Sequence, residues 1–182
     1  AASDVYKRQV YELSEKKILE ILSDFADPKP YVTETVASLR EMGMKIGSTT
    51  GYTDEMMSIV VPKAKELGYE PDCWFSPNAV GNYGRPYPYM IFKNMETLGL
   101  SDVRAVIKVG DTVSDIREGI NAGMKTVGIV EGSSVLGLSK GEFDALTEKE
   151  QREQYERAEK IYKEAGADYV IRDIRGLLDI VK

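Results

Sequence analysis

The sequence AVIKVGDTVSDIREGINAG, at residues 105–123, contains the features that decide the fold. Residues 105–109 are apolar apart from Lys108, which predicts a short buried strand. Polar residues follow at once, and the pattern over 111–122 predicts a loop that enters a helix, which ends at Gly123. A strand followed by a loop and a helix is the unit from which parallel sheets are built.

The rest of the chain repeats this unit. On both sides of it, short apolar runs alternate with segments in which apolar residues recur every three or four positions. This alternation predicts an α/β fold of Rossmann-like type, with one parallel sheet and helices on both of its faces. We expect strands at residues 44–50, 73–75, 126–130 and 168–171, and helices at residues 10–26, 31–42, 54–67, 86–98, 142–165 and 174–181.

Prolines and polar clusters mark local breaks in this pattern. Pro62 lies inside a predicted helix and should kink or break it, whereas Pro86 is well placed in the first turn of another. The long charged segment at 142–165 should break near residues 146–147. The stretch Asp-Pro-Lys-Pro at 27–30 predicts a stiff hinge or a boundary.

Composition excludes several classes of protein. The 182 residues contain no histidine, which excludes Ser-His-Asp and Cys-His nucleophile systems and zinc held by histidine. One cysteine cannot close an internal disulfide. The 24 basic and 30 acidic residues give a net charge of −6, so there is no basic surplus for nucleic acid. Since no apolar run is long enough to span a membrane, we expect a cytoplasmic protein of one domain or one domain with an appendage.

Two carboxylates follow the central predicted strand. Asp111 and Asp115 stand four residues apart beyond its carboxyl end, where parallel sheets bind their ligands. Such a pair can converge on one hard cation, and Mg²⁺ prefers one or two carboxylates together with water and phosphate oxygens. The alternative interpretation makes one of them a helix cap and the other a surface carboxylate.

Hydroxyl groups follow the first predicted strand. This strand ends at the stretch Thr49-Thr50-Gly51-Tyr52, whose hydroxyls and backbone N–H groups can hold a phosphate oxygen. The alternative is that the threonines simply cap the next helix.

An arginine stands at the entry to the helix predicted at 86–98. Pro86 forces Arg85 toward an extended backbone, and an arginine there can bind a phosphate through two N–H groups. The alternative is a surface arginine in a turn braced by proline. The stretch Gly-Ser-Ser at 132–134 is predicted only as a polar loop.

Together these stretches resemble one family. Hydroxyls after one strand, a cation at a later helix entry and paired aspartates after the next strand occur in this order in the haloacid dehalogenase superfamily. The sequences GSTTGYT at 47–53, GRPYP at 84–88 and VGDTVSD at 109–115 resemble those of its phosphonoacetaldehyde hydrolases, or phosphonatases. Most members of the superfamily have a lysine where GRPYP has arginine. The sequence GSSVLGL at 132–138 fits the same family, and the resemblance extends over nearly the whole chain.

The resemblance implies an Mg²⁺-dependent hydrolase of phosphonate degradation. Members of that family cleave the carbon–phosphorus bond of phosphonoacetaldehyde, which gives acetaldehyde and phosphate. An aspartate is their nucleophile, and a lysine of a helical cap domain forms a Schiff base with the aldehyde.

The same resemblance assigns roles to residues of this chain. Asp111 would ligate Mg²⁺ and Asp115 would orient the metal shell. Thr50 would hydrogen-bond the phosphoryl oxygens and Arg85 would neutralise their charge. The substrate-binding residues implied in this way are Thr50, Gly51, Tyr52 and Arg85.

The sequence also departs from the family. A strand that ends in D-x-A-G-T begins the family's core and carries the nucleophile, and no such segment occurs among the 182 residues. The cap with its Schiff-base lysine is absent except for its last helix. We therefore expect a fragment that is inactive alone, with an artefact or tail at 1–9, the last cap helix at 10–27 and the core domain at 28–182.

The missing strand would lie in the middle of the family's sheet. Its neighbours would be the strand that ends at Thr50 and the strand that ends at Val109. These two strands should then either pair with each other or leave backbone groups unpaired.

Two other functions stay open at this point. The chain could come from another small-molecule phosphatase of the superfamily, or it could be a phosphate-binding pseudoenzyme. In the phosphonatase interpretation its partner is a small phosphonate, and the full-length form is a possible homodimer.

Overall fold

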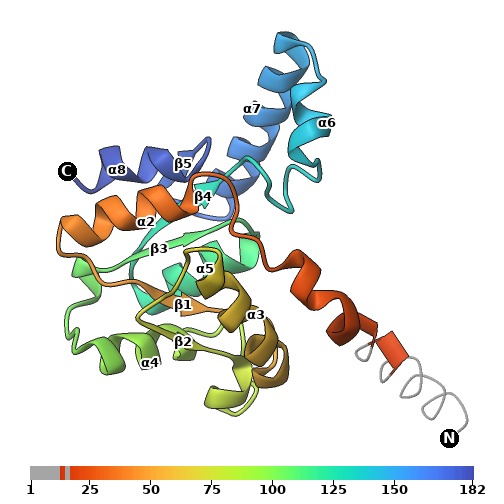
Figure 1. Ribbon diagram of the computed structural model, residues 1–182. Helices are drawn as coiled ribbons and strands as arrows, with labels where there is room; N and C mark the ends of the chain where they lie inside the picture. Colours follow the sequence, from red (N-terminus) through yellow and green to blue (C-terminus); the bar gives the residue numbers. More distant parts are fainter. Residues whose placement is uncertain (1–12, 15–16) are drawn as a thin grey trace, which may run out of the picture.

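The computed structural model describes residues 13–14 and 17–182, which form an α/β fold with two parallel sheets (Figure 1). In the first sheet, β1 (Gly47–Thr49) pairs with β2 (Cys73–Phe75). The second contains β3 (Ile107–Gly110), β4 (Lys125–Ile129) and β5 (Tyr169–Ile171), in this order. The predicted α/β class and the parallel pairing are confirmed, although the described strands form two sheets in place of one.

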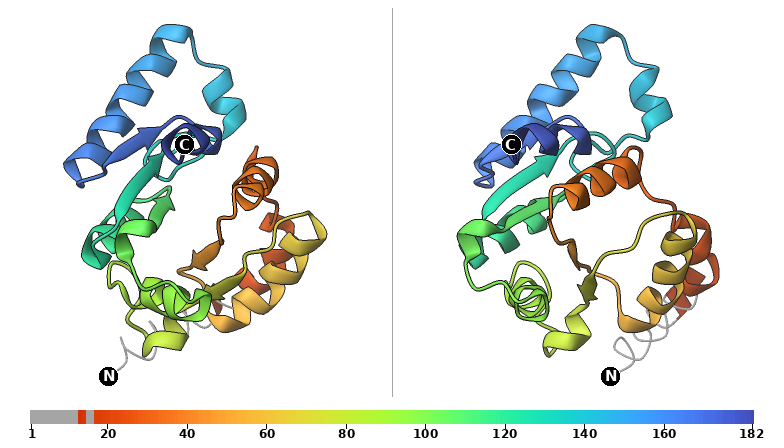
Figure 2. Two further views of the ribbon diagram at one scale, coloured as in Figure 1. Left: turned by 90° about the vertical axis from the view of Figure 1, so that its left-hand side faces the viewer. Right: turned by 60° about the vertical axis from the view of Figure 1, so that its left-hand side comes forward.

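The division falls between β1 and β3. Each of these strands is an edge of its own sheet, and within the described residues neither pairs with the other. Of the two outcomes expected for these neighbours, the structure has the one without direct pairing. The link between the sheets is made by helices, because α4 packs on β1 and β2 and also contacts α5, which packs on β3 and β4 (Figure 2).

Most helices lie where the sequence predicts them. The stretch 17–21 is helical, and short 3₁₀ helices follow at Leu22–Phe25 and further along the chain. The predictions for residues 1–9, and for most of 10–16, lie outside the described residues. The other helices are α2 (Val32–Glu41), α3 (Asp54–Glu66), α4 (Tyr89–Leu98), α5 (Val113–Ala122), α6 (Lys140–Asp144), α7 (Glu148–Glu164) and α8 (Leu177–Ile180), with 3₁₀ helices at Pro77–Val80, Val103–Ala105 and Ile174–Gly176.

Helix boundaries follow local chemistry. Gly43, two residues after the end of α2, and Gly123, directly after α5, have φ of 83° and 77°, the left-handed conformation that glycine adopts without strain. The predicted break in the charged segment separates α6 from α7, where Thr147 and Glu150 form a capping box.

The structure differs from expectation at two prolines. Of the kink or break expected at Pro62, the break does not occur, since α3 runs through it. Pro62 is exposed, so water can satisfy the carbonyl that loses its N–H partner. The helix expected from Pro86 begins only at Tyr89, because residues 84–88 form a turn in which the N–H of Tyr87 donates to the carbonyl of Gly84 at 3.1 Å.

Helices cover both faces of the larger sheet, as predicted. On one face, Leu39 of α2 and Leu177 of α8 pack with Val127 and Ile171. The other face is covered by α5 and α7. Because burial of apolar surface is the main stabilising term, these two layers fix the sheet between them.

Helix α7 packs tightly against β4. Tyr162 is fully buried, and its hydroxyl donates to the carbonyl of Ile129 at 2.9 Å. Its ring lies so close to Gly128 that a Cβ there would be 2.7 Å from Cγ of Tyr162. Burial raises the pKa of Tyr162 to about 12.

A buried charged cluster joins the two sheets. Lys108 of β3 extends its ammonium to three acceptors on different elements. Its Nζ lies 2.7 Å from Oγ1 of Thr49 on β1, 3.0 Å from Oδ1 of Asp115 and 2.8 Å from Oε2 of Glu118. Glu118 is fully buried, and its other oxygen, Oε1, has no hydrogen-bond partner among the described residues. Lys108 is therefore the cation on which two buried carboxylates depend.

No helix among the described residues combines the length and the apolar character that crossing a membrane requires.

We predict that Lys108→Met lowers the free energy of unfolding by about 3–5 kcal/mol, because buried carboxylates lose their cation. Urea unfolding followed by circular dichroism measures this. Lys45→Met, at an exposed position, is the matched control and should change stability by less than about 1 kcal/mol. Equal losses in the two variants would contradict the role of the cluster.

We also predict that stability falls between pH 10 and pH 12. A pKa raised in the folded state stabilises the fold below the unfolded pKa of 10 and ceases to do so as the pH rises toward about 12. The loss should be about 2–3 kcal/mol and should shrink in Tyr162→Phe. Urea midpoints at pH 9 and pH 11.5 test this, with Tyr83→Phe, at a largely exposed residue, as the control.

Candidate active site

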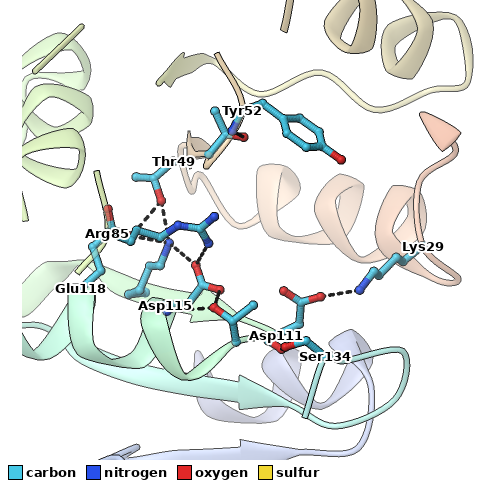
Figure 3. A network of polar contacts seen from close by, with 11 residues as sticks. Lys29, Thr49, Tyr52, Arg85, Asp111, Asp115, Glu118 and Ser134 are labelled. Carbon is cyan, nitrogen blue, oxygen red and sulfur yellow. Dashed lines mark hydrogen bonds and ion pairs between the residues drawn. The ribbon is translucent and has the colours of Figure 1, made fainter. Parts of the chain in front are cut away.

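The candidate residues meet where β1 and β3 end (Figure 3). Figure 3 shows Asp111 and Asp115 beyond the end of β3, with Arg85 and the loop of Tyr52 above them. In a parallel α/β sheet, the loops that follow the strands lie at the same edge of the sheet. The structure therefore brings together groups that are distant in sequence, such as Arg85 and Asp115, which are 30 residues apart.

Asp115 is held rigidly at the start of α5. Thr112 caps this helix: its hydroxyl accepts from the N–H of Asp115 at 3.1 Å and donates to Oδ2 at 2.5 Å. Gly110 leaves the space that this carboxylate needs, since a Cβ there would lie 2.2 Å from Cβ of Asp115.

Two cations bind the same carboxylate. Nη1 of Arg85 lies 2.5 Å and Nζ of Lys108 3.0 Å from Oδ1 of Asp115. Burial by itself would raise the pKa of Asp115, but Lys108 and Arg85, with the hydrogen bond from Thr112, lower the pKa below its ordinary value of 3.8. Asp115 is therefore ionised at neutral pH, and it is not the surface carboxylate of the alternative interpretation.

Arg85 lies against the loop that follows β1. A Cβ on Gly51 would be 3.0 Å from Nη2 of Arg85, so glycine allows the guanidinium to approach the backbone. The side chain of Arg85 is 22% exposed, which makes it a partly buried group of this site and not a surface arginine. Its bond to Asp115 uses Nη1, and Nη2 faces the loop.

The hydroxyls after β1 do not cap the next helix. Thr53 performs that role, since its Oγ1 accepts from the N–H of Met56 at 3.3 Å. Thr49 belongs to the buried cluster, where its Oγ1 also donates to Oε2 of Glu118 at 2.9 Å. The hydroxyl of Thr50 accepts from the N–H of Tyr52 at 3.0 Å, which keeps its own hydrogen available for a ligand.

Asp111 has a partner that the sequence did not suggest. Nζ of Lys29 forms an ion pair with Oδ2 of Asp111 and donates to the carbonyl of Gly132 at 2.6 Å. The hydroxyl of Ser134 donates to the carbonyl of Asp111 at 3.2 Å. The loop at 132–134, predicted only as a polar rim, thus supports the end of β3.

Sequence reasoning missed Lys29, Lys108 and Glu118 as members of the site. One signal was present, because Lys108 is the single charged residue in an otherwise apolar strand. Such a residue needs a buried partner. No comparable signal marks Lys29, which stands in the predicted hinge.

Asp111 and Asp115 are the two carboxylates that could hold a metal ion at this edge of the sheet. They supply hard carboxylate oxygens, and both already hold cationic side chains in place. Among the described residues no group of three or more histidine, cysteine, aspartate and glutamate side chains could hold a metal ion. These two carboxylates fit Mg²⁺ only as one or two of its ligands, and water and a phosphoryl group would have to supply the others.

The chain is similar to a group of hydrolases. The family model described as haloacid dehalogenase-like hydrolase matches residues 3–123, and one described as HAD-hydrolase-like matches residues 82–177. Proteins named phosphonoacetaldehyde hydrolase from Lysinibacillus sphaericus and Bacillus cereus (strain G9842) are 49% and 45% identical. The matches cover 92% and 99% of this chain, and 62% and 68% of those proteins.

A solved structure matches the fold closely. The crystal structure of a phosphonoacetaldehyde hydrolase-like protein from Oleispira antarctica superimposes with a TM-score of 0.90 at 33% identity. The match covers 96% of this chain and 63% of that one. The chain thus spans less than two thirds of this protein and of the Lysinibacillus relative.

We predict that Gly110→Ala disturbs the site. The new Cβ overlaps Asp115, so the unfolding free energy should fall by about 1–3 kcal/mol. Gly141→Ala is the matched control, because a Cβ there meets nothing within 4 Å and alanine favours the helix. Urea unfolding of both variants measures the difference, and an undisturbed Gly110→Ala would show that Asp115 is not held in this way.

Proposed function

Because this chain belongs to the phosphonoacetaldehyde hydrolases of the haloacid dehalogenase-like family, we propose that its residues serve hydrolysis of the carbon–phosphorus bond of phosphonoacetaldehyde. The products would be acetaldehyde and phosphate. The activity is proposed for the full-length form, since the 182 residues contain neither the D-x-A-G-T nucleophile segment nor an identifiable Schiff-base lysine.

One observation carries the proposal. Arg85 and Gly51 come from two loops and Asp115 from the first turn of α5, and the three meet within contact distance at the sheet edge. A guanidinium beside a glycine turn and an ionised carboxylate is the arrangement that a phosphoryl group and a divalent cation require.

In this proposal Asp111 and Asp115 hold Mg²⁺, which neutralises negative charge on the phosphoryl group when it is bound. Arg85 keeps Nη1 on Asp115 and donates from Nη2 to a phosphoryl oxygen, and the free hydrogen of Thr50 donates to another. Gly51 permits the close approach, and Tyr52 lines the mouth of the site. Preorganised cations and donors of this kind stabilise charge without reorganisation during transfer.

The partner in this proposal is a small phosphonate. The acidic net charge of −6 does not favour nucleic acid, and a homodimer of the full-length form and a cytoplasmic location belong to the same proposal.

The test is release of acetaldehyde and phosphate from phosphonoacetaldehyde in the presence of Mg²⁺. We expect little activity from the 182-residue chain and measurable activity once a family-type N-terminal strand and cap are fused to it. In the fused form, Asp111→Asn and Arg85→Gln should each lower kcat/KM by about 10²–10³-fold.

Arg104→Gln, at a side chain that is 86% exposed and lies outside the site, is the matched control. Hydrolysis of phosphate monoesters in preference to phosphonoacetaldehyde would indicate another phosphatase of the superfamily. Phosphate binding without turnover in any form would indicate a pseudoenzyme.

A further inference from the structure

Lys29 occupies a position that the proposed reaction does not use. It belongs to the segment between the 3₁₀ helix Leu22–Phe25 and α2, yet its ammonium reaches the loops that follow β3 and β4. There it pairs with Asp111 and donates to the carbonyl of Gly132 at 2.6 Å. Figure 3 shows this pair on the side of the cluster away from Arg85.

Both carboxylates of the candidate metal site are thus neutralised by the chain itself. Asp115 is bound by Arg85 and Lys108, and Asp111 is bound by Lys29. Within the described residues, the ion pair between Lys29 and Asp111 uses one carboxylate oxygen, Oδ2. A divalent cation at this oxygen would meet the positive charge of the ammonium at contact distance, so Lys29 opposes its binding for as long as the ion pair stays closed.

The two pairs differ in how easily they open. Asp115 is 5% exposed, whereas the side chains of Lys29 and Asp111 are 53% and 37% exposed. Exposed ion pairs contribute little to stability, so the Lys29 pair can be displaced at small cost. Gly132 offers Lys29 a second acceptor, which keeps the ammonium beside the site after displacement.

We propose that Lys29 is a built-in counter-cation of Asp111 that competes with the divalent metal for this carboxylate. Displacement leaves the ammonium unpaired next to a newly bound divalent cation. A phosphoryl anion then meets extra positive charge, so metal and anion each raise the affinity for the other. This inference rests on the proposed function and describes how metal binding at the same site would be regulated.

The test is binding of Mn²⁺, a hard cation that accepts the same oxygen ligands, followed through the paramagnetic resonance signal of free Mn²⁺. Without phosphate, Lys29→Gln should bind Mn²⁺ about three- to fivefold more tightly than the parent chain, which is the range an exposed ion pair supports. Lys29→Arg retains the competing cation and should stay within about twofold of the parent.

Lys140→Gln is the matched control. Lys140 lines the same cavity of about 200 Å³ as Lys29, but its ammonium pairs with Asp144 and not with Asp111. Removal of Lys140 should therefore leave Mn²⁺ affinity unchanged. The Lys29→Gln effect should become smaller at an ionic strength of 0.5 M, because salt screens an exposed ion pair.

The outcomes separate this inference from the proposed function. Equal Mn²⁺ affinity in the parent and in Lys29→Gln, with loss of binding in Asp111→Asn, would overturn the role of Lys29 and leave the metal site in place. Equal tightening in Lys29→Gln and Lys140→Gln would also overturn it, because general charge would then be the cause. Mn²⁺ binding that Asp111→Asn does not weaken, or no binding at all, would overturn both.

Discussion

The fold depends on one buried cation. Lys108 stands on an edge strand of one sheet and bonds Thr49 on the facing edge strand of the other, while it neutralises two carboxylates of α5. No strand pairing joins β1 to β3 in the described residues. Side-chain hydrogen bonds therefore connect these two strands, where backbone hydrogen bonds would connect paired strands. The cost of burying these charges is recovered only while all of them are present.

The same cluster sets the electrostatics of the candidate site. Asp115 is shared, because Lys108 binds it from the core and Arg85 from the side of Gly51. Two cations hold this ionised carboxylate in place, and its fixed position also fixes Arg85 beside Gly51. Stability and site geometry therefore cannot be varied independently at this position.

Local chemistry predicted much of this structure. The strand, loop and helix at 105–123, the glycine that ends α5 and the capped break before α7 follow from patterns within a few residues. The convergence of Arg85 and Asp115 also follows, since loops of a parallel sheet meet at one edge.

Other features depend on distant parts of the chain and could not be read locally. The separation of β1 from β3 is a property of how strands assemble, and no residue of either strand signals it. The pair of Lys29 with Asp111 joins residues 82 positions apart, and a lysine in a polar hinge resembles any exposed lysine. The start of α4 was misplaced because a proline fits both a first helical turn and the tight turn that the chain adopts.

The fit of Tyr162 against Gly128 has a consequence for how such a sequence can evolve. A larger residue at 128 collides with the ring, whereas a smaller one at 162 leaves a hole and frees the carbonyl of Ile129. Neither position can therefore drift alone, and a lineage that changes one must change the other almost at once. The two residues, 34 positions apart, should be inherited as a single unit.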